Sequence, residues 1–256
     1  MRREVCLAGG GWQDFSGPTR RDTTPPSSGD LLLPEQLNLR LFAEWADLSS
    51  TLGPLAFLSS RPRGTLQLDA LLLAVALEGL HRRLHVNDLP FPSITRNGLN
   101  RAKDAAVDAG VAKLTTEGWE DKAFSAERFR NAVGFVGQET YAERLHALLE
   151  PVSAVAPGLF GPSLADWITH MKAVRNIQSH QLADHDEFRA REIDLYFVLT
   201  ESAAWAYRLA ILMQLVPAAA LREPLQASNR FSYSLANIDL TGFWQSYSCS
   251  EAFRNS

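Results

Sequence analysis

The sequence predicts an all-α fold, a helical bundle preceded by a flexible N-terminal segment. Apolar residues recur at spacings of three and four, as in Leu37, Leu41, Trp45 and Leu48, which gives a helix one apolar face. Alternation with a period of two is not sustained, so strand signals are scarce. With 46% hydrophobic and 21% charged residues, most of the 256-residue chain can bury a core. We therefore expect helices to build that core.

Three regions are expected along the chain. Residues 1–33 are rich in Gly, Pro and Ser and can bury little apolar surface, so they are either a flexible lead-in or the remnant of an upstream domain. Residues 34–222 are predicted to form the helical domain. Residues 223–256 are mixed and aromatic, and we expect this tail to pack back on the bundle.

The first half of the helical domain has two clear helices. One follows Pro34, and the other covers about 65–84 and is ended by prolines at 90 and 92, because proline disfavours helix in the residue before it. The apolar stripe of the second helix is predicted to consist of Leu68, Leu71, Leu72, Val75 and Leu80. Further helices are expected over about 94–107 and 125–150, with a looser segment around Gly110 and Gly118 between them.

In the second half, residues 151–162 contain Pro and Gly and are predicted to be a connector. Ser163 then fits an N-cap, with Asp166 three residues later as a shortened capping-box partner. That helix runs through 175–180, and a long helix over roughly 187–216 is stopped by Pro217.

Composition excludes several classes of protein. The net charge of -4 argues against a broad, sequence-independent nucleic-acid binder, although it allows an enzyme that acts on RNA at one local site. Cys6 and Cys249 stand near opposite ends with no further Cys or His around them, which argues against a disulfide scaffold or a zinc site. No transmembrane or signal-peptide segment is visible, so we expect a cytoplasmic protein with no membrane partner.

The segment 175–180 (Arg-Asn-Ile-Gln-Ser-His) has the residue types for RNA cleavage without a metal. Such cleavage needs a base, an acid and a positive charge near one phosphodiester. His180 suits proton transfer because its pKa lies near neutrality, and the planar fork of Arg175 suits a phosphate. Asn176 can position a phosphate oxygen or orient the imidazole without adding charge. The alternative is a surface arginine and a histidine that interacts with the helix dipole.

Helix geometry sets a condition on this motif. Asn176 and His180 share one face, whereas Arg175 points about 100° away from Asn176. Either the helix ends near Ser179, or a second subunit completes the site. The second possibility predicts a homodimer with the two motifs facing each other.

The motif and its helical context resemble the HEPN superfamily, whose active-site signature is Arg, a polar residue and, after a short spacer, His. Arg175, Asn176 and His180 match that signature. The ApeA-like branch is the closer resemblance, because its early helix carries a segment like 77–82 (Leu-Glu-Gly-Leu-His-Arg). The resemblance spans roughly 35–220 and implies a metal-independent endoribonuclease with a role in prokaryotic anti-phage defence. Members of this branch usually carry an N-terminal, largely β domain ahead of the helical region, which this sequence does not show. We therefore expect either a truncated form or a separately encoded regulatory or sensor partner.

Glu78 is informative on its own, because its spacing from Leu71 and Ala74 puts a carboxylate on or beside the buried face. A buried carboxylate needs a partner. One interpretation is that Glu78 orients Arg175 or His180, as the acidic residue of the first helix does in HEPN nucleases. The other is a structural salt bridge with Arg82. Both stay open.

Other candidates are weaker. His180 with Asp184, His185 and Asp186 resembles a metal-ligand set, but a solvated link between helices explains these residues better, and we predict no metal and no cofactor. Trp167 and Trp205 are expected in the core.

Two functions remain in view. The first is a HEPN endoribonuclease that cleaves RNA, with tRNA as one candidate substrate. The second is a catalytically inactive helical module for dimerisation or partner binding.

Overall fold

The computed structural model describes residues 31–32, 36–60, 64–85, 93–180 and 189–246, without the side chains of 59–60, 178–180 and 189–192. Within these ranges the secondary structure is helical and contains no strand, which confirms the predicted all-α class. The chain divides into two compact units. We call Met1–Leu84 with Tyr141–Ser256 the core unit, and His85–Thr140 the inserted unit.

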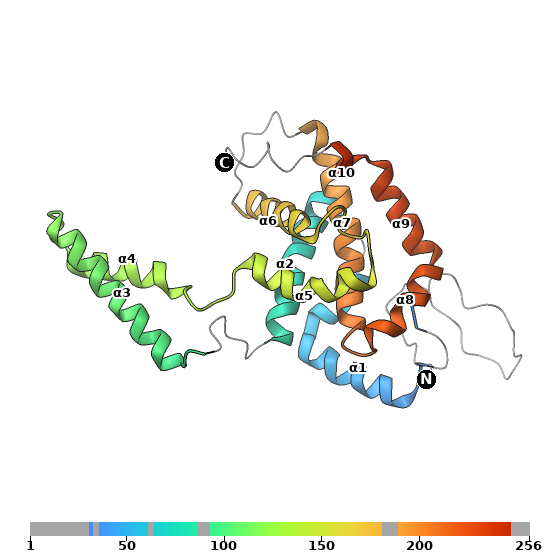
Figure 1. Ribbon diagram of the computed structural model, residues 1–256, viewed down its shortest axis with the longest axis horizontal. Helices are drawn as coiled ribbons and strands as arrows, with labels where there is room; N and C mark the ends of the chain where they lie inside the picture. Colours follow the sequence, from blue (N-terminus) through green and yellow to red (C-terminus); the bar gives the residue numbers. More distant parts are fainter. Residues whose placement is uncertain (1–30, 33–35, 61–63, 86–92, 181–188, 247–256) are drawn as a thin grey trace, which may run out of the picture. The chain divides into compact units, whose positions relative to one another are not determined.

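The core unit is a bundle built around one long helix, α7 (Arg189–Leu212), which is drawn in orange in Figure 1. Its described residues are apolar on nearly every side, as expected of a helix that is buried all round. It packs against α2, α5, α6, α9 and α10. The other elements of this unit are α1 (Leu39–Leu52), η2 (Gly53–Ser60), α2 (Leu66–Leu84), α5 (Tyr141–Val155), α6 (Leu164–His180), α8 (Ala218–Ala227), α9 (Asn229–Leu240) and α10 (Phe243–Ser246).

The end of α1 is fixed to α2 by an arginine. The side chain of Asn38 caps the start of α1 by accepting a hydrogen bond from the Leu41 amide at 3.0 Å. At the other end, Arg83 Nη1 donates to the carbonyls of Thr51 and Leu52 at 2.9 Å and 2.5 Å. These carbonyls belong to the last turn of α1, where carbonyl groups have no following N–H group of the helix to accept from. A side chain of α2 therefore completes α1.

The position of α2 agrees with the prediction, but its predicted apolar stripe is wrong in part. Leu80 is buried as expected, whereas Leu68 and Val75 are exposed. The buried face also contains three alanines, and small side chains allow close approach to the neighbouring helices α5, α6 and α7. The fully or largely buried residues of α2 are Asp69, Ala70, Leu73, Ala74, Ala76, Leu77, Glu78, Leu80 and His81. Glu78 thus lies on the buried face, as predicted.

The connector predicted over 151–162 is shorter than expected. Helix α5 continues through Pro151 to Val155, and the exposed position of this proline lets the helix tolerate its missing N–H. The turn that follows uses positive φ angles at Gly158 and Gly161. The predicted cap of α6 is confirmed, since the Ser163 hydroxyl accepts from the Asp166 amide at 3.0 Å and donates to its carboxylate at 2.8 Å.

The inserted unit is a helical hairpin of α3 (Arg96–Thr116) and α4 (Lys122–Gly134), which pack against each other. Here the predicted helices 94–107 and 125–150 are corrected. The first continues to Thr116, and the second is two helices, because 135–140 separate α4 from α5. Gly110 lies inside α3 and not in a loop. A β-carbon at Gly110 would lie 2.7 Å from the ring of Phe129, so glycine makes room for this ring against α3.

The C-terminal elements contribute to the same core as the central helices. Helix α7 ends at Leu212, a few residues before the predicted 216, and Pro217 precedes α8. Phe231, Ile238 and Phe243 are buried in the core cluster. Most of the lead-in predicted over 1–33 lies outside the described residues, and the predicted domain boundaries at 34 and 223 stay predictions. Among the described helices, none has both the length and the apolar character of a membrane span.

Candidate active site

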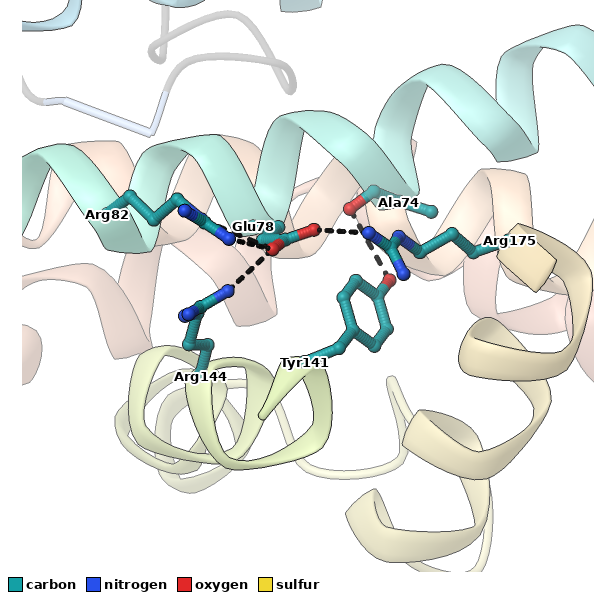
Figure 2. Close-up of polar contacts among 6 residues, drawn as sticks. All are labelled: Ala74, Glu78, Arg82, Tyr141, Arg144 and Arg175. Carbon is teal, nitrogen blue, oxygen red and sulfur yellow. Dashed lines mark hydrogen bonds and ion pairs between the residues drawn. The ribbon is translucent and has the colours of Figure 1, made fainter. Parts of the chain in front are cut away.

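Glu78 stands at the centre of a group of charged side chains from three helices. Its side chain is only 10% exposed, yet its oxygens contact three arginines. Arg82 Nη2 and Arg144 Nη1 lie 2.8 Å and 2.6 Å from Oε1, and Arg175 Nη2 lies 3.0 Å from Oε2 (Figure 2). We call Glu78, Arg82, Arg144 and Arg175 the carboxylate cluster. Because its members come from α2, α5 and α6, the cluster joins three helices at one point.

The three arginines differ in how firmly they are held. Arg82 follows Glu78 by four residues on α2, the spacing at which helical side chains meet, and its side chain is 55% exposed. Exposed pairs of this kind contribute about 0–1 kcal/mol. Arg144 comes from α5 and is 9% exposed, whereas Arg175 of α6 is 34% exposed. Within the cluster, Arg144 is therefore the buried arginine, and the guanidinium group of Arg175 is partly open to solvent.

Two opposing effects set the charge of Glu78. Burial raises the pKa of the Glu78 carboxyl group. The hydrogen bond from Arg82 and the charges of Arg175, Arg82 and Arg144 lower it by more, so the pKa of Glu78 lies below its ordinary value. Glu78 is therefore a carboxylate at neutral pH, and each arginine faces a full negative charge.

The carboxylate cluster has more positive than negative charge. Within the part of the chain that the structure describes, Glu78 is the only carboxylate that forms an ion pair with any of its three arginines. Three guanidinium groups around one carboxylate leave an excess of two positive charges, in a chain whose net charge is -4. Such a local excess attracts anions, and the planar guanidinium group favours carboxylate or phosphate oxygens.

Tyr141, the first residue of α5, holds Arg175 from a second direction. The guanidinium carbon of Arg175 lies 4.9 Å from the centroid of the Tyr141 ring, in cation–π contact. The Tyr141 hydroxyl donates to the Ala74 carbonyl of α2 at 3.4 Å (Figure 2). Burial raises the pKa of Tyr141 and Glu78 raises it further, while Arg175 lowers it; the net direction is upward, so the phenol keeps its proton. Arg175 is thus held both by an ion pair and by a ring.

The structure brings only part of the predicted motif together. Arg175 meets Glu78, and Asn176 is half-buried beside it on α6. His180 is the last residue of α6, and its side chain lies outside the described residues. On a regular helix Arg175 and His180 point about 140° apart. The roles assigned to Asn176 and His180 therefore stay predictions.

The weaker candidates lie in different surroundings. Trp167 and Trp205 are buried in the core, as predicted. Among the residues that the structure covers, no group of three His, Cys, Asp or Glu could hold a metal ion. Asp184, His185 and Asp186 lie outside the described residues.

Arg144 and Tyr141 were not found from the sequence. Arg144 lies 66 positions from Glu78, and no local pattern connects the two. A signal was present, however, because Arg144 stands between Tyr141 and Leu145 in the apolar stripe of α5. A charged residue on a buried face needs a partner, and this is the reasoning that singled out Glu78.

Comparison with known proteins supports a family assignment. The model of the Apea-like HEPN family matches residues 71–216, which is more than half of the chain and includes the whole carboxylate cluster as well as Asn176 and His180. A comparison with curated proteins and one with solved structures each found no match. A family match of this extent, on an all-α bundle, is sufficient for assignment. The chain belongs to the Apea-like HEPN family.

Proposed function

We propose that this protein is a metal-independent endoribonuclease of the HEPN type, with Arg175, Asn176 and His180 as its catalytic residues and Glu78 as their support. One observation carries the proposal. The ion pair between Arg175 and Glu78 holds a partly exposed guanidinium group on the same end of α6 that carries Asn176 and His180. Membership of a HEPN family indicates an RNase or a nucleotide-binding module in general.

The proposed reaction needs no group beyond these side chains and the RNA. A base removes the proton of a 2′-OH, and the 2′-oxygen forms a bond to the adjacent phosphorus. The bond from phosphorus to the 5′-oxygen breaks, and an acid returns a proton to that oxygen. The products are a 2′,3′-cyclic phosphate and a 5′-hydroxyl end. His180 acts as base or acid, Arg175 stabilises the phosphoryl charge, and Asn176 positions a phosphate oxygen.

The electrostatics of the carboxylate cluster support this assignment. Arg175 has five N–H donors, and its ion pair with Glu78 is made by one terminal nitrogen. Donors therefore remain for a phosphate on the 34% of the side chain that is exposed. The excess positive charge of the cluster adds to the attraction, because charges in a partly buried site are weakly screened.

The geometry of α6 supports a site that two copies complete. Residues five apart on a regular helix, such as 175 and 180, differ in direction by about 140°. A homodimer with facing motifs can then supply the arginine from one copy and the histidine from the other. On the family resemblance, the proposed substrate is RNA, with tRNA as one candidate, and the proposed role is anti-phage defence. A separately encoded regulatory partner is part of the same proposal.

A second function fits the same contacts. In a catalytically inactive module, Glu78 and its three arginines only join α2, α5 and α6, and the bundle serves dimerisation or partner binding. The partial exposure of Arg175 favours the nuclease, because it leaves guanidinium donors accessible to a phosphate.

The two functions predict different results in one experiment. Purified protein is incubated with total RNA or with tRNA in EDTA, beside His180→Ala. The nuclease predicts cleavage by the parent and none by the variant, with fragments that end in a 2′,3′-cyclic phosphate. His146→Ala is the matched control, because His146 is an exposed histidine of α5 outside the carboxylate cluster.

The outcomes are distinct. Equal cleavage by the parent and His180→Ala excludes His180 as the catalytic histidine. No cleavage by either protein, together with a dimer in sedimentation analysis, supports the inactive module.

A further inference from the structure

Three helices of the core unit are joined in pairs around Arg175. Glu78 and Arg175 join α2 to α6, and Arg144 and Glu78 join α5 to α2. The ring of Tyr141 joins α5 to α6 by its contact with Arg175. Figure 2 shows this arrangement, with Arg82 and Arg144 on one side of the Glu78 carboxylate and Arg175 on the other. Arg175 of α6 is thus contacted from both α2 and α5.

The two oxygens of Glu78 have separate partners. Oε1 accepts from Arg144 at 2.6 Å and from Arg82 at 2.8 Å, while Oε2 faces Arg175 at 3.0 Å. The terminal torsion of a glutamate is broad and does not fix the plane of its carboxylate. Arg82 is exposed and lies on the same helix as Glu78, so it fixes that plane poorly. Arg144 is buried and held by a different helix, so it provides the stronger constraint.

Stability alone does not favour a buried arginine at this position. Removing a guanidinium group from water costs several kcal/mol, on the order of what a buried ion pair returns, and well-packed apolar residues often replace such pairs at no loss. Position 144 lies in an apolar stripe where leucine or methionine would pack. Arg144 therefore adds little to stability, but it contacts the Glu78 carboxylate that holds Arg175. Its effect on Arg175 explains why a charge stands at this position.

We propose that Arg144 is a positioning residue of the site, which holds Oε1 of Glu78 from α5 and thereby reserves Oε2 for Arg175. The role of Arg144 in RNA cleavage rests on the proposed function, whereas its effect on Arg175 does not. Arg144 itself touches no substrate. Because Arg144 holds Glu78, the guanidinium group of Arg175 keeps one orientation toward the phosphate.

The first measurement is the rate of cleavage of a short RNA in EDTA. Arg144→Met is expected to lower kcat by about 10- to 100-fold, the range seen when groups that orient a reacting residue are removed. KM is expected to change much less, because Arg175 acts chiefly on charge that develops in the transition state. Arg144→Lys keeps the positive charge and a single donor nitrogen in place of the planar fork, and it is expected to retain part of kcat. Arg222→Met removes an exposed arginine of α8 and is the matched control.

The second measurement does not depend on cleavage. Nitrogen-15 NMR records the guanidinium signals of Arg175, which are assigned by their absence in Arg175→Lys. In the parent, hindered rotation is expected to give separate, sharp Nη signals. In Arg144→Met these signals are expected to broaden or merge, because the carboxylate of Glu78 is no longer held on Oε1.

Each result decides the proposal. Unchanged Arg175 signals in Arg144→Met overturn it, whether kcat falls or not, because a loss of kcat would then reflect general destabilisation. If the parent cleaves no RNA, the proposed function fails and the NMR signals alone decide whether Arg144 positions Arg175. If Arg144→Met does not fold, Arg144→Gln and Arg144→Lys are compared in the same two measurements.

Discussion

The indole Nε1 of Trp167 donates a hydrogen bond to the hydroxyl of Ser202 at 2.7 Å, in the core between α6 and α7. Both side chains are completely buried. The Ser202 hydroxyl in turn donates to the Val198 carbonyl at 2.6 Å. This link fixes the helix that carries Arg175 to the central helix of the core unit. Its strength therefore bears on the site as well as on the fold.

Ser202→Ala is expected to lower the free energy of unfolding by about 1–3 kcal/mol, because it leaves the buried Nε1 of Trp167 without its acceptor. Urea unfolding monitored by circular dichroism measures the change. Ser153→Ala is the control, since the Ser153 hydroxyl donates to the Glu150 carbonyl on an exposed face and its loss is expected to cost much less. Equal losses in the two variants would contradict this account.

Glu78→Gln is expected to lower the free energy of unfolding by about 3–5 kcal/mol, because Arg144 is left buried beside an uncharged partner. Arg82→Met is expected to cost about 1 kcal/mol or less, since Arg82 is exposed. Urea midpoints of both variants test the difference. If Arg82→Met is as costly as Glu78→Gln, the burial of the cluster does not control its energy.

Arg175→Lys keeps the positive charge but loses the planar fork of donors. If the proposed function holds, kcat for RNA cleavage is expected to fall by about 100- to 1000-fold, as when a donor to developing charge is removed. Lys172→Ala, one turn earlier on the exposed face of α6, is expected to leave kcat near that of the parent. A fully active Arg175→Lys would mean that charge alone suffices at this position.

His170 gives the fold a dependence on pH. It is buried against Phe243 and Trp244, and burial lowers its pKa from 6.5 to about 4, although Asp166 raises it. Because the folded pKa is depressed, the unfolded chain binds the proton first as the pH falls. The stability contributed by neutral His170 is therefore present above pH 6.5 and is lost as the pH falls toward about 4.

The measurement is the urea midpoint at several pH values between 7.5 and 4, for the parent and for His170→Gln. The parent is expected to lose stability more steeply than the variant between pH 6.5 and 4. Parallel curves would show that His170 does not titrate differently in the two states.

Gly110→Ala is expected to destabilise the inserted unit. Alanine at an exposed position inside a helix usually adds about 1 kcal/mol over glycine. Here, however, its β-carbon would lie 2.7 Å from the ring of Phe129, so either this ring must move or α3 and α4 must separate. Hydrogen exchange of the α3 and α4 amides measures the effect. Phe129→Leu in the same chain is expected to recover part of the loss, and faster exchange that persists would point to a different cause.

The all-α class could be predicted from the sequence because helical periodicity and cap residues are local properties. Ser163 and Asp166 show this well, since both members of the cap lie within one turn of α6. The faces of the helices were harder to predict. In α2 the large side chains of Leu68 and Val75 suggested the wrong stripe, because the buried face depends on how closely other helices approach.

Long-range contacts account for what the sequence did not reveal. Gly110 suggests a loop in the sequence, but it lies within α3 against the ring of Phe129. Arg144 has its partner Glu78 on another helix, so no local pattern singles it out. Glu78 was found because a charge on an apolar face is itself a signal. Its partner Arg144 lies 66 positions away in the sequence, and only the folding of the chain brings the two side chains together.

The inserted unit leaves the core unit after Leu84, at the end of α2, and rejoins it at Tyr141, the first residue of α5. Arg82 stands two residues before the first junction, and Arg144 stands one turn after the second. Both covalent junctions of the inserted unit with the core unit therefore lie within one helical turn of a member of the carboxylate cluster.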